Sequence, residues 1–426
     1  MGIAARSGTG ELERAFVHGV DVFRPLRVGR VLVARSPLVT SFKDNLMSCK
    51  SAASMRCSKG KSRPRSPAKT RRRAPKAVAA RLVTAAFAPL TALNRGGAKQ
   101  RKARKKAVGR SLGVVMSQLR AGQALMPASV TGAGRSDPAP KIPEGAQYLA
   151  RRYRCMAGAR RYKLYLPASQ PKRPKGLLLM LHGCSQSPDD FALGTHMNHL
   201  AEKHGLAIAY PAQTRQNNAS SCWNWFRPGD QARGVGEPAL LAALTRKLMK
   251  ELGVGRDRTF VAGLSAGGAM AAILVDAYPE VYAAAGIHSG LARGAATDMR
   301  SAVAAMRNGS DGDHPHARAQ TIKPVRRIVF HGDGDSTVNP SNALHIVTGA
   351  LGCDAAPSQV VRRTVRGRAY IKSTYAALEG AGALELWIVT GAGHAWSGGR
   401  KAGSFTDKKG PDASAQMIRF FLTESA

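Results

Sequence analysis

The chain has 426 residues, and 44% of them are hydrophobic, so enough apolar material is present for a well-buried core. The formal net charge of +39 is uneven, because residues 1–130 hold 28 Lys and Arg against only 4 Asp and Glu. No run of about 18 uncharged apolar residues occurs, which argues against a transmembrane segment. The six cysteines form no CxxC pair and have no histidine spacing typical of zinc, so neither a metal nor another cofactor is expected.

Residues 1–139 read as a basic, low-complexity extension, with basic runs at 58–76 (SKGKSRPRSPAKTRRRAPK) and 98–110 (AKQRKARKKAVGR). Such blocks repel themselves and bury little apolar area, so we predict disorder, or a start codon assigned too early, with Met55 or Met116 as the true start. Their charge also favours polyanions, so a nucleic-acid or anionic-granule binding module is a hypothesis from another class. No aromatic interleaving or helix-turn-helix pattern accompanies the charge, which favours the first interpretation.

The compartment is not decided by the sequence. The segment 71–98 has a basic front and an apolar centre like a secretion signal, but it is internal and carries Arg81 and Pro89. It would act only if translation began downstream of the first methionine. An oxidising compartment would permit one or two disulfides, whereas in a cytosol the cysteines would be free thiols.

From about residue 140 to residue 426, short apolar runs alternate with helical patterns, which predicts an α/β domain with a mostly parallel central sheet and helices on both faces. An antiparallel hairpin is expected to open it, at 148–169, around the turn AGA. The later strands are expected at 176–183, 206–211, 259–263, 282–290, 326–332 and 384–391. The helices are expected near 189–204, 236–252, 266–278, 296–307, 340–351 and 412–423. Right-handed crossovers place the strand C-terminal ends, where ligands bind, along one edge.

Ser265 is the candidate nucleophile, because it lies in the G-x-S-x-G pattern GLSAG directly after a strand and directly before an alanine-rich helix. Small residues on both sides allow a sharp strand-to-helix turn that exposes the hydroxyl. The helix N-terminus favours developing negative charge. The alternative is a small residue where a helix packs closely, but the strand and helix context favours a nucleophile.

A serine hydroxyl needs a base, and the base needs an orienting acid, in the chain order Ser, acid, His for this architecture. His394, framed by glycines after the last strand, is the expected base. His182, His288 and His331 lie at other strand ends, but each precedes or misses that order.

Two acids follow the strand at 326–332, and they are only two residues apart in one glycine-rich loop. Asp335 is favoured, because a loop leaving the strand at Gly332 needs a few residues to bring a carboxylate under the His394 ring. Asp333 is expected instead to accept hydrogen bonds from backbone amides in the turn.

Acyl transfer also requires donors for an oxyanion. The backbone N–H of Ala266 is the first candidate. The amide of Cys184, in the loop HGCSQSPDD that His182 and Gly183 shape, is the second. The alternative for this loop is an ordinary strand-to-helix turn.

Several motifs in order resemble the poly(3-hydroxybutyrate) depolymerase family of esterases, α/β-hydrolases related to feruloyl and acetylxylan esterases. They include MLHGCSQSPDDFALGTHMNHLAEKHGLAIAYPAQ, NNASSCWNWFRPGDQARGVGEPALL, VAGLSAGGAM, GIHSG, HGDGDSTVNP and GAGHAWSGG. The resemblance runs from about Tyr148 to about Phe421. It implies an α/β-hydrolase fold and the same nucleophile, acid and base, Ser265, Asp335 and His394.

The resemblance also implies that the HGC loop lines the oxyanion hole and that the segment CWNWF, residues 222–226, is a wall of the acyl site. A disulfide between Cys184 and Cys222 and an extracellular location follow by the same analogy. The candidate substrate contacts are Trp223, Trp225, Phe226 and Trp396, and the alternative for each of them is plain core.

The expected activity is that of a serine carboxylic-ester hydrolase acting on short-chain hydroxyalkanoate esters or oligomers. A feruloyl or acetylxylan esterase is the alternative, because acyl selectivity depends on pocket depth and a few side chains. The chain ends soon after the last expected helix and carries no Thr-rich or Ser-rich linker, so attack on crystalline polymer is not expected. A hydrolase-like fold without activity is disfavoured by the ordered Ser, Asp and His.

Overall fold

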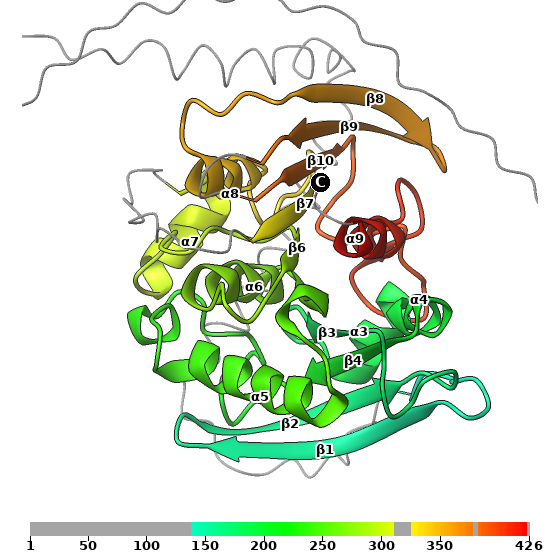
Figure 1. Ribbon diagram of the computed structural model, residues 1–426. Coiled ribbons are helices and arrows are strands. Elements are labelled where there is room, and N and C mark those ends of the chain that lie inside the picture. Colours follow the sequence, from blue (N-terminus) through cyan, green and yellow to red (C-terminus); the bar gives the residue numbers. More distant parts are fainter. Residues whose placement is uncertain (1–137, 311–324, 378–381, 424–426) are drawn as a thin grey trace, which may run out of the picture. The chain divides into compact units, whose positions relative to one another are not determined.

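The computed structural model describes residues 138–310, 325–377 and 382–423, all of which belong to one compact unit of the chain (Figure 1). The expectations for the basic extension, including polyanion binding and the signal-like segment 71–98, lie outside the described residues. For the domain proposed at residues 140–426, the first described strand begins at Gln147.

One sheet contains ten strands in the order β1-β2-β4-β3-β5-β6-β7-β10-β9-β8. The six central strands, from β4 to β10 in that order, pair in parallel, and an antiparallel pair of strands flanks them on each side. The strands are β1 (Gln147–Cys155), β2 (Gly158–Leu166), β3 (Gly176–Leu181), β4 (Leu206–Pro211), β5 (Thr259–Leu264), β6 (Ala284–His288), β7 (Arg326–Gly332), β8 (Gln359–Val365), β9 (Arg368–Tyr375) and β10 (Leu384–Val389). A separate short pair joins β11 (Trp396–Ser397) and β12 (Thr406–Asp407).

Helices cover both faces of this sheet, as expected for an α/β-hydrolase fold. In Figure 1, α5 to α8 lie on one side of the sheet and α3, α4 and α9 on the other. The helices are α3 (Pro188–Thr195), α4 (Met197–His204), α5 (Gly236–Leu252), α6 (Ala266–Ala277), α7 (Met299–Asn308), α8 (Ser341–Leu351) and α9 (Ala413–Leu422), with the 3-10 turns η1 (Pro228–Asp230) and η2 (Arg256–Arg258). The predicted fold class is confirmed.

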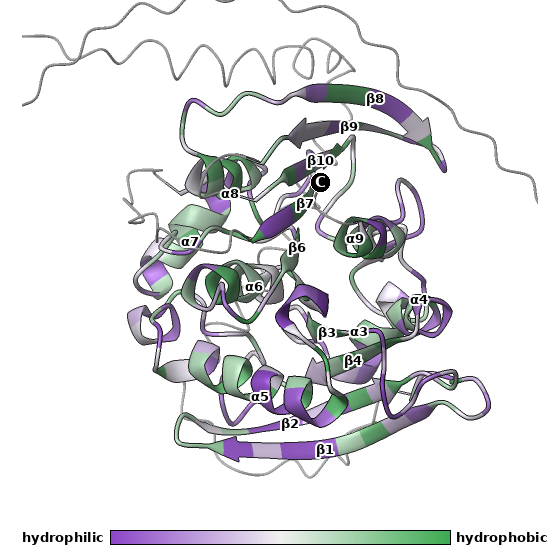
Figure 2. Cartoon of the chain, viewed as in Figure 1, coloured by the Kyte–Doolittle hydropathy of each residue, from purple (hydrophilic) through white to green (hydrophobic). Residues whose placement is uncertain are grey.

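The central strands separate two hydrophobic cores, which explains their continuous apolar sequences. In β3, Leu177 and Leu179 pack with α5 and α6, whereas Leu178 and Met180 point to the core beneath α3, α4 and α9. Successive side chains of a strand point to opposite faces, so a strand that is covered on both faces needs an apolar residue at every position. In Figure 2, hydrophilic residues recur instead along the edge strands β1 and β8.

The structure differs from the predicted elements at several places. The helix expected at 189–204 is two helices, because His196 takes a left-handed conformation (φ 55°) and its N–H closes α3 on Ala192 O. The opening hairpin turns at Met156 and Ala157, since Cys155 pairs directly with Gly158. The β8–β9 hairpin was not predicted from the sequence.

No helix of the described residues is both long enough and apolar enough to cross a bilayer. Within the same ranges, no group of three or more His, Cys, Asp or Glu side chains is arranged to hold a metal ion.

Candidate active site

Ser265 occupies a sharp turn between β5 and α6. Its backbone lies at φ 57° and ψ −120°, a conformation that costs a non-glycine residue about 1–3 kcal/mol. The turn requires its two flanking glycines. A Cβ atom on Gly263 would lie 2.8 Å from the Gly268 nitrogen, and one on Gly267 would lie 2.6 Å from the His182 carbonyl oxygen. The G-x-S-x-G spacing is therefore a steric requirement of this strand-to-helix turn, which we call the elbow.

The elbow is held from below by the neighbouring strand. The Ser265 N–H donates to the carbonyl oxygen of His288 at 2.9 Å, and the Ser265 carbonyl accepts from Ala269 at the start of α6. Almost all of α6 is buried, whereas Ser265 itself is partly exposed. The hydroxyl-bearing residue is thus fixed at the end of a buried helix and borders a pocket.

Asp335 and His394 are in direct contact. His394 Nδ1 lies 2.7 Å from Asp335 Oδ2, while Asp335 Oδ1 accepts from the amides of Thr337 and Val338, each at 2.9 Å. Burial alone would raise the pKa of Asp335, but the charge and hydrogen bond of His394, together with His331, hold that pKa well below its usual range. The carboxylate is therefore charged and keeps the Nδ1 proton on His394, which leaves Nε2 as the basic nitrogen.

The second acid of the loop has another contact. Asp333 Oδ1 accepts from the backbone N–H of Gly391 at 2.5 Å and so ties the β7 loop to the β10 loop. The two loops also meet through Gly332, where a Cβ atom would lie 2.9 Å from the Cβ of Ala392.

The other strand-end histidines are buried and paired. His182 Nε2 accepts from the Gln213 amide at 3.0 Å, and burial lowers the pKa of His182 to about 4. His331 Nε2 lies 3.0 Å from Val338 O, and burial lowers its pKa as well. His288 Nε2 accepts from the Ser397 amide at 3.0 Å. All three imidazoles are neutral near pH 7.

The backbone amides of Cys184 and Ala266 donate no hydrogen bond within the described part of the chain. The loop that presents Cys184 is closed by Gln186, whose Oε1 accepts from Gly183 N at 2.9 Å, and by Ser185, whose N–H donates to Ser220 O. These are the two donors expected for an oxyanion.

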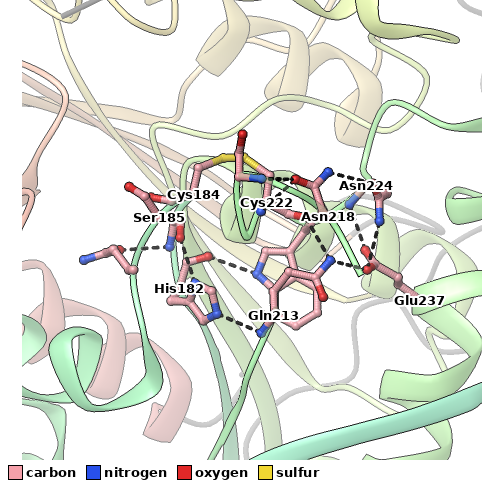
Figure 3. Close-up of a disulfide and its surroundings, with 12 residues drawn as sticks. His182, Cys184, Ser185, Gln213, Asn218, Cys222, Asn224 and Glu237 are labelled. Carbon is pink, nitrogen blue, oxygen red and sulfur yellow. Dashed lines mark hydrogen bonds between the residues drawn. A yellow bond between two sulfur atoms is a disulfide. The ribbon is translucent and has the colours of Figure 1, made fainter. Parts of the chain in front are cut away.

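A disulfide joins Cys184 to Cys222, 38 residues further along the chain (Figure 3). It connects the loop after β3 to the segment 222–226. The other described cysteines, Cys155 and Cys353, are free thiols.

A buried polar cluster, which was not predicted from the sequence, supports the same segment. Glu237 accepts from the amide and the side chain of Asn224, at 2.8 and 3.2 Å, and pairs with Arg160 at 3.2 Å. Gln213 lies between them, and its Nε2 donates to Cys222 O at 2.8 Å (Figure 3). A buried ion pair is stable only with such additional hydrogen bonds. No local pattern signals it, because its members lie up to 77 residues apart.

The pocket beside Ser265 has an apolar wall. The disulfide, Trp225 and Phe226 form one side of it. One face of α7 forms another, with the side chains of Met299, Ala302, Val303 and Met306. The α7 wall was not predicted, since its residues look like any amphipathic helix.

Trp223 and Trp396 do not line this pocket, although both were expected as substrate contacts. Trp223 is fully buried, and its Nε1 donates to His182 O at 3.0 Å. Trp396 is also buried, and its Nε1 donates to Ser414 Oγ at 3.0 Å. An indole that is packed on all sides and satisfied by the protein has no surface left for a ligand.

The structure thus brings together Asp335 and His394, and places Ser265 beside Cys184, Cys222, Trp225 and Phe226. No hydrogen bond links Ser265 Oγ to His394 Nε2 among the described residues. Catalytic hydrogen bonds are often long before a substrate binds, so this geometry is compatible with a serine–histidine pair that tightens on binding.

Residues 160–367 match the family model described as esterase PHB depolymerase. The poly(3-hydroxyalkanoate) depolymerase C of Paucimonas lemoignei is 32% identical over 241 residues, which cover 54% of this chain and 56% of that protein. A probable acetylxylan esterase A of Aspergillus clavatus is 26% identical, over 42% of this chain and 61% of the relative. A feruloyl esterase B of Neurospora crassa is 28% identical, over 33% of this chain and 47% of the relative.

The chain therefore spans only about half of the length of these curated relatives. Among solved structures, an acetyl xylan esterase from Aspergillus awamori matches 58% of this chain and 93% of its own, with 19% sequence identity and a TM-score of 0.48.

Proposed function

We propose that the protein is a carboxylic-ester hydrolase that works through an acyl-enzyme on Ser265, because residues 160–367 match the family model described as esterase PHB depolymerase. The observation that carries this proposal is the combination of a strained serine turn with a separate, directly bonded Asp335–His394 pair.

In the proposed reaction, Ser265 Oγ attacks the ester carbonyl carbon while His394 Nε2 takes the hydroxyl proton. Asp335 keeps the Nδ1 proton in place and stabilises the imidazolium that forms. The tetrahedral intermediate then collapses, the bond to the alcohol oxygen breaks, and His394 returns its proton to that oxygen. Water repeats the sequence on the acyl-enzyme, which releases the acid and restores the Ser265 hydroxyl.

The developing oxyanion would be bound by the amides of Cys184 and Ala266. This charge forms only during the reaction, so hydrogen bonds from the two amides would lower the barrier rather than strengthen substrate binding. The N-terminal end of α6 adds a favourable dipole at the same place.

The substrate class that fits best is a short-chain hydroxyalkanoate ester or oligomer. Two features support it: the apolar pocket next to Ser265, with the flexible side chains of Met299 and Met306, and the higher identity to the depolymerase than to the other two curated relatives. A feruloyl or acetylxylan ester is the second candidate, because relatives with those names match the same region. A panel of matched nitrophenyl butyrate, hydroxybutyrate oligomer, feruloyl and acetyl-xylan substrates, ranked by kcat/KM, separates the two.

The nucleophile is tested by Ser265→Ala. We expect kcat for a short-chain nitrophenyl ester to fall on the order of 10⁶-fold, because no other group can form the acyl-enzyme. Circular dichroism and the thermal unfolding midpoint check that the variant is folded. A fluorophosphonate probe should label wild-type protein at Ser265 by mass spectrometry, and leave the variant unlabelled. Hydrolysis by the purified variant, or labelling of another serine, would overturn the assignment.

A further inference from the structure

We propose that His288 is a positioning residue for this reaction: its imidazole holds the loop that carries His394 against the elbow that carries Ser265. The inference rests on the proposed function, because it concerns the alignment of that serine and that histidine. His288 ends β6 and contacts neither the pocket nor a substrate, so it would act only through its neighbours.

His288 bonds to both catalytic segments. Its carbonyl oxygen accepts from Ser265 N at 2.9 Å, and its Nε2 accepts from Ser397 N at 3.0 Å. Ser397 lies three residues after His394, at the end of the two-residue strand β11. One residue of the sheet therefore fixes the backbone of the nucleophile and the backbone of the loop that carries the base.

The protonation of the imidazole follows from these contacts. Nε2 accepts an amide proton, so the ring proton is on Nδ1, which faces Ser289 Oγ at 3.3 Å. The ring is buried, and burial lowers the pKa of His288 to about 3. A cationic ring would have no lone pair for Ser397, so the neutral form is the one that anchors the loop.

Stacking fixes the ring itself. His288 lies between Trp396, with ring centroids 5.1 Å apart, and Phe330, at 5.7 Å. The stack continues through Trp387 to Tyr370, with spacings of 5.1 and 5.0 Å. A ring held on both faces cannot rotate away, and Nε2 therefore stays directed at the Ser397 amide.

Loss of the acceptor on His288 would change the distance between His394 and Ser265. The His394 ring itself is held by Asp335. Further along the loop, the Trp396 N–H donates to Phe405 O at 2.7 Å and Ser397 Oγ donates to Pro411 O at 2.7 Å, so the bond from Ser397 N–H to His288 is one of several anchors of this loop. If Ser397 lost its acceptor, the loop could shift while Ser265 stayed in place. A misplacement of about 1 Å can cost on the order of 10²-fold in rate. The positioning role thus belongs to the side chain of His288, since its carbonyl oxygen survives any substitution.

The test separates the acceptor from the ring with two variants and a packing control. His288→Phe keeps a stacked ring and removes the acceptor. His288→Gln removes the ring and keeps an acceptor oxygen at about the position of Nε2. Phe330→Leu disturbs the same stack from the other side and leaves the His288–Ser397 bond intact.

In the full-length protein, with the best ester of the panel, we expect His288→Phe to lower kcat about 10- to 100-fold with KM within about twofold. His288→Gln should recover at least half of that loss on a logarithmic scale, and Phe330→Leu should stay near wild-type kcat. Equal kcat in His288→Phe and wild type would overturn the proposal. A similar loss of kcat in His288→Phe, His288→Gln and Phe330→Leu would also overturn it, because packing would then be the cause.

A measurement without turnover keeps this test independent of the proposed esterase activity. The Nδ1 proton of His394, bonded to Asp335, should give a strongly downfield proton NMR signal. Amide hydrogen exchange at Ser397 reports its bond to His288. We expect His288→Phe to broaden the signal and speed the exchange, and His288→Gln to preserve both. Unchanged exchange in His288→Phe would reject the positioning role, whereas activity in Ser265→Ala would reject the proposed function alone.

Discussion

At the scale of single residues, the two aspartates of the β7 loop show how neighbouring carboxylates take different roles. Asp335 is buried and faces His394, whereas Asp333 faces a backbone amide at Gly391. The chain order and loop length were enough to favour Asp335 from the sequence. The actual hydrogen bonds were not predictable, because they depend on how the β7 and β10 loops meet.

Asp335→Asn and Asp333→Asn form a matched pair. With Asp335→Asn, the amide can present its NH₂ group to His394 and favour the wrong tautomer, so we expect kcat to fall by roughly 10⁴-fold with the fold intact. With Asp333→Asn, the oxygen can still accept from Gly391, so kcat should stay within about tenfold of wild type. Steady-state kinetics on one ester decide the matter. The reverse ranking of the two variants would make Asp333 the catalytic acid.

At the scale of elements, predictability follows burial. Strands covered on both faces, such as β4 and β7, have continuous apolar sequences, and their ends agree with the predicted ranges. The β8–β9 hairpin was missed because β8 is exposed at nearly every position and its sequence, QVVRRTV, is rich in arginine. The break at His196 was missed for another reason: the residue in the left-handed conformation is a histidine, not the glycine that usually ends a helix in this way.

The candidate site was predictable to the extent that it follows from element order. Ser265, Asp335 and His394 each follow a strand, and parallel strands end at one edge of the sheet. The support beneath them was not predictable, because the Arg160–Glu237 pair and the α7 wall depend on tertiary packing.

Gly267→Ala tests the junction of β5, α6 and the loop after β3. The new Cβ would overlap the carbonyl oxygens of Leu181 and His182. We expect a loss of about 3 kcal/mol or more in the free energy of unfolding, and loss of activity, because the elbow and the loop after β3 must move apart. Gly255→Ala is the control, since nothing lies within 4 Å of its Cβ, and it should change stability by less than about 0.5 kcal/mol. Urea unfolding measures both. Equal stability of the two variants would contradict the steric explanation.

At the scale of the whole described domain, three buried neutral histidines lie at or directly after the ends of β3, β6 and β7. Burial lowers the pKa of His182 to about 4 and of His288 to about 3, and it also lowers the pKa of His331. In the unfolded chain each would titrate at the ordinary value of 6.5. Below that pH, the unfolded state binds protons that the folded state does not.

The free energy of unfolding should therefore fall as the pH drops from 6.5 towards 4, by up to about 1.4 kcal/mol per pH unit for each of His182 and His288. His331 adds to the loss in the same direction, because burial lowers its pKa as well. Asp335 adds to the loss only below its ordinary pKa of 3.8, since its folded-state pKa is depressed. Urea unfolding at pH 7, 6, 5 and 4.5 measures the slope. His288→Gln should reduce the slope by one group. A flat profile would mean that these rings are accessible to protons in the folded state.

The disulfide between Cys184 and Cys222 has a consequence for how this protein would choose among substrates. It covalently links a wall of the pocket, which includes Trp225 and Phe226, to the residue whose amide is proposed to bind the oxyanion. An acyl group too bulky for the pocket would push this wall outward and carry the amide with it. Such a substrate would still dock but would be turned over slowly. Discrimination between acyl groups would then affect kcat more than KM. The fit of the acyl chain in the pocket would determine the rate of the chemical step.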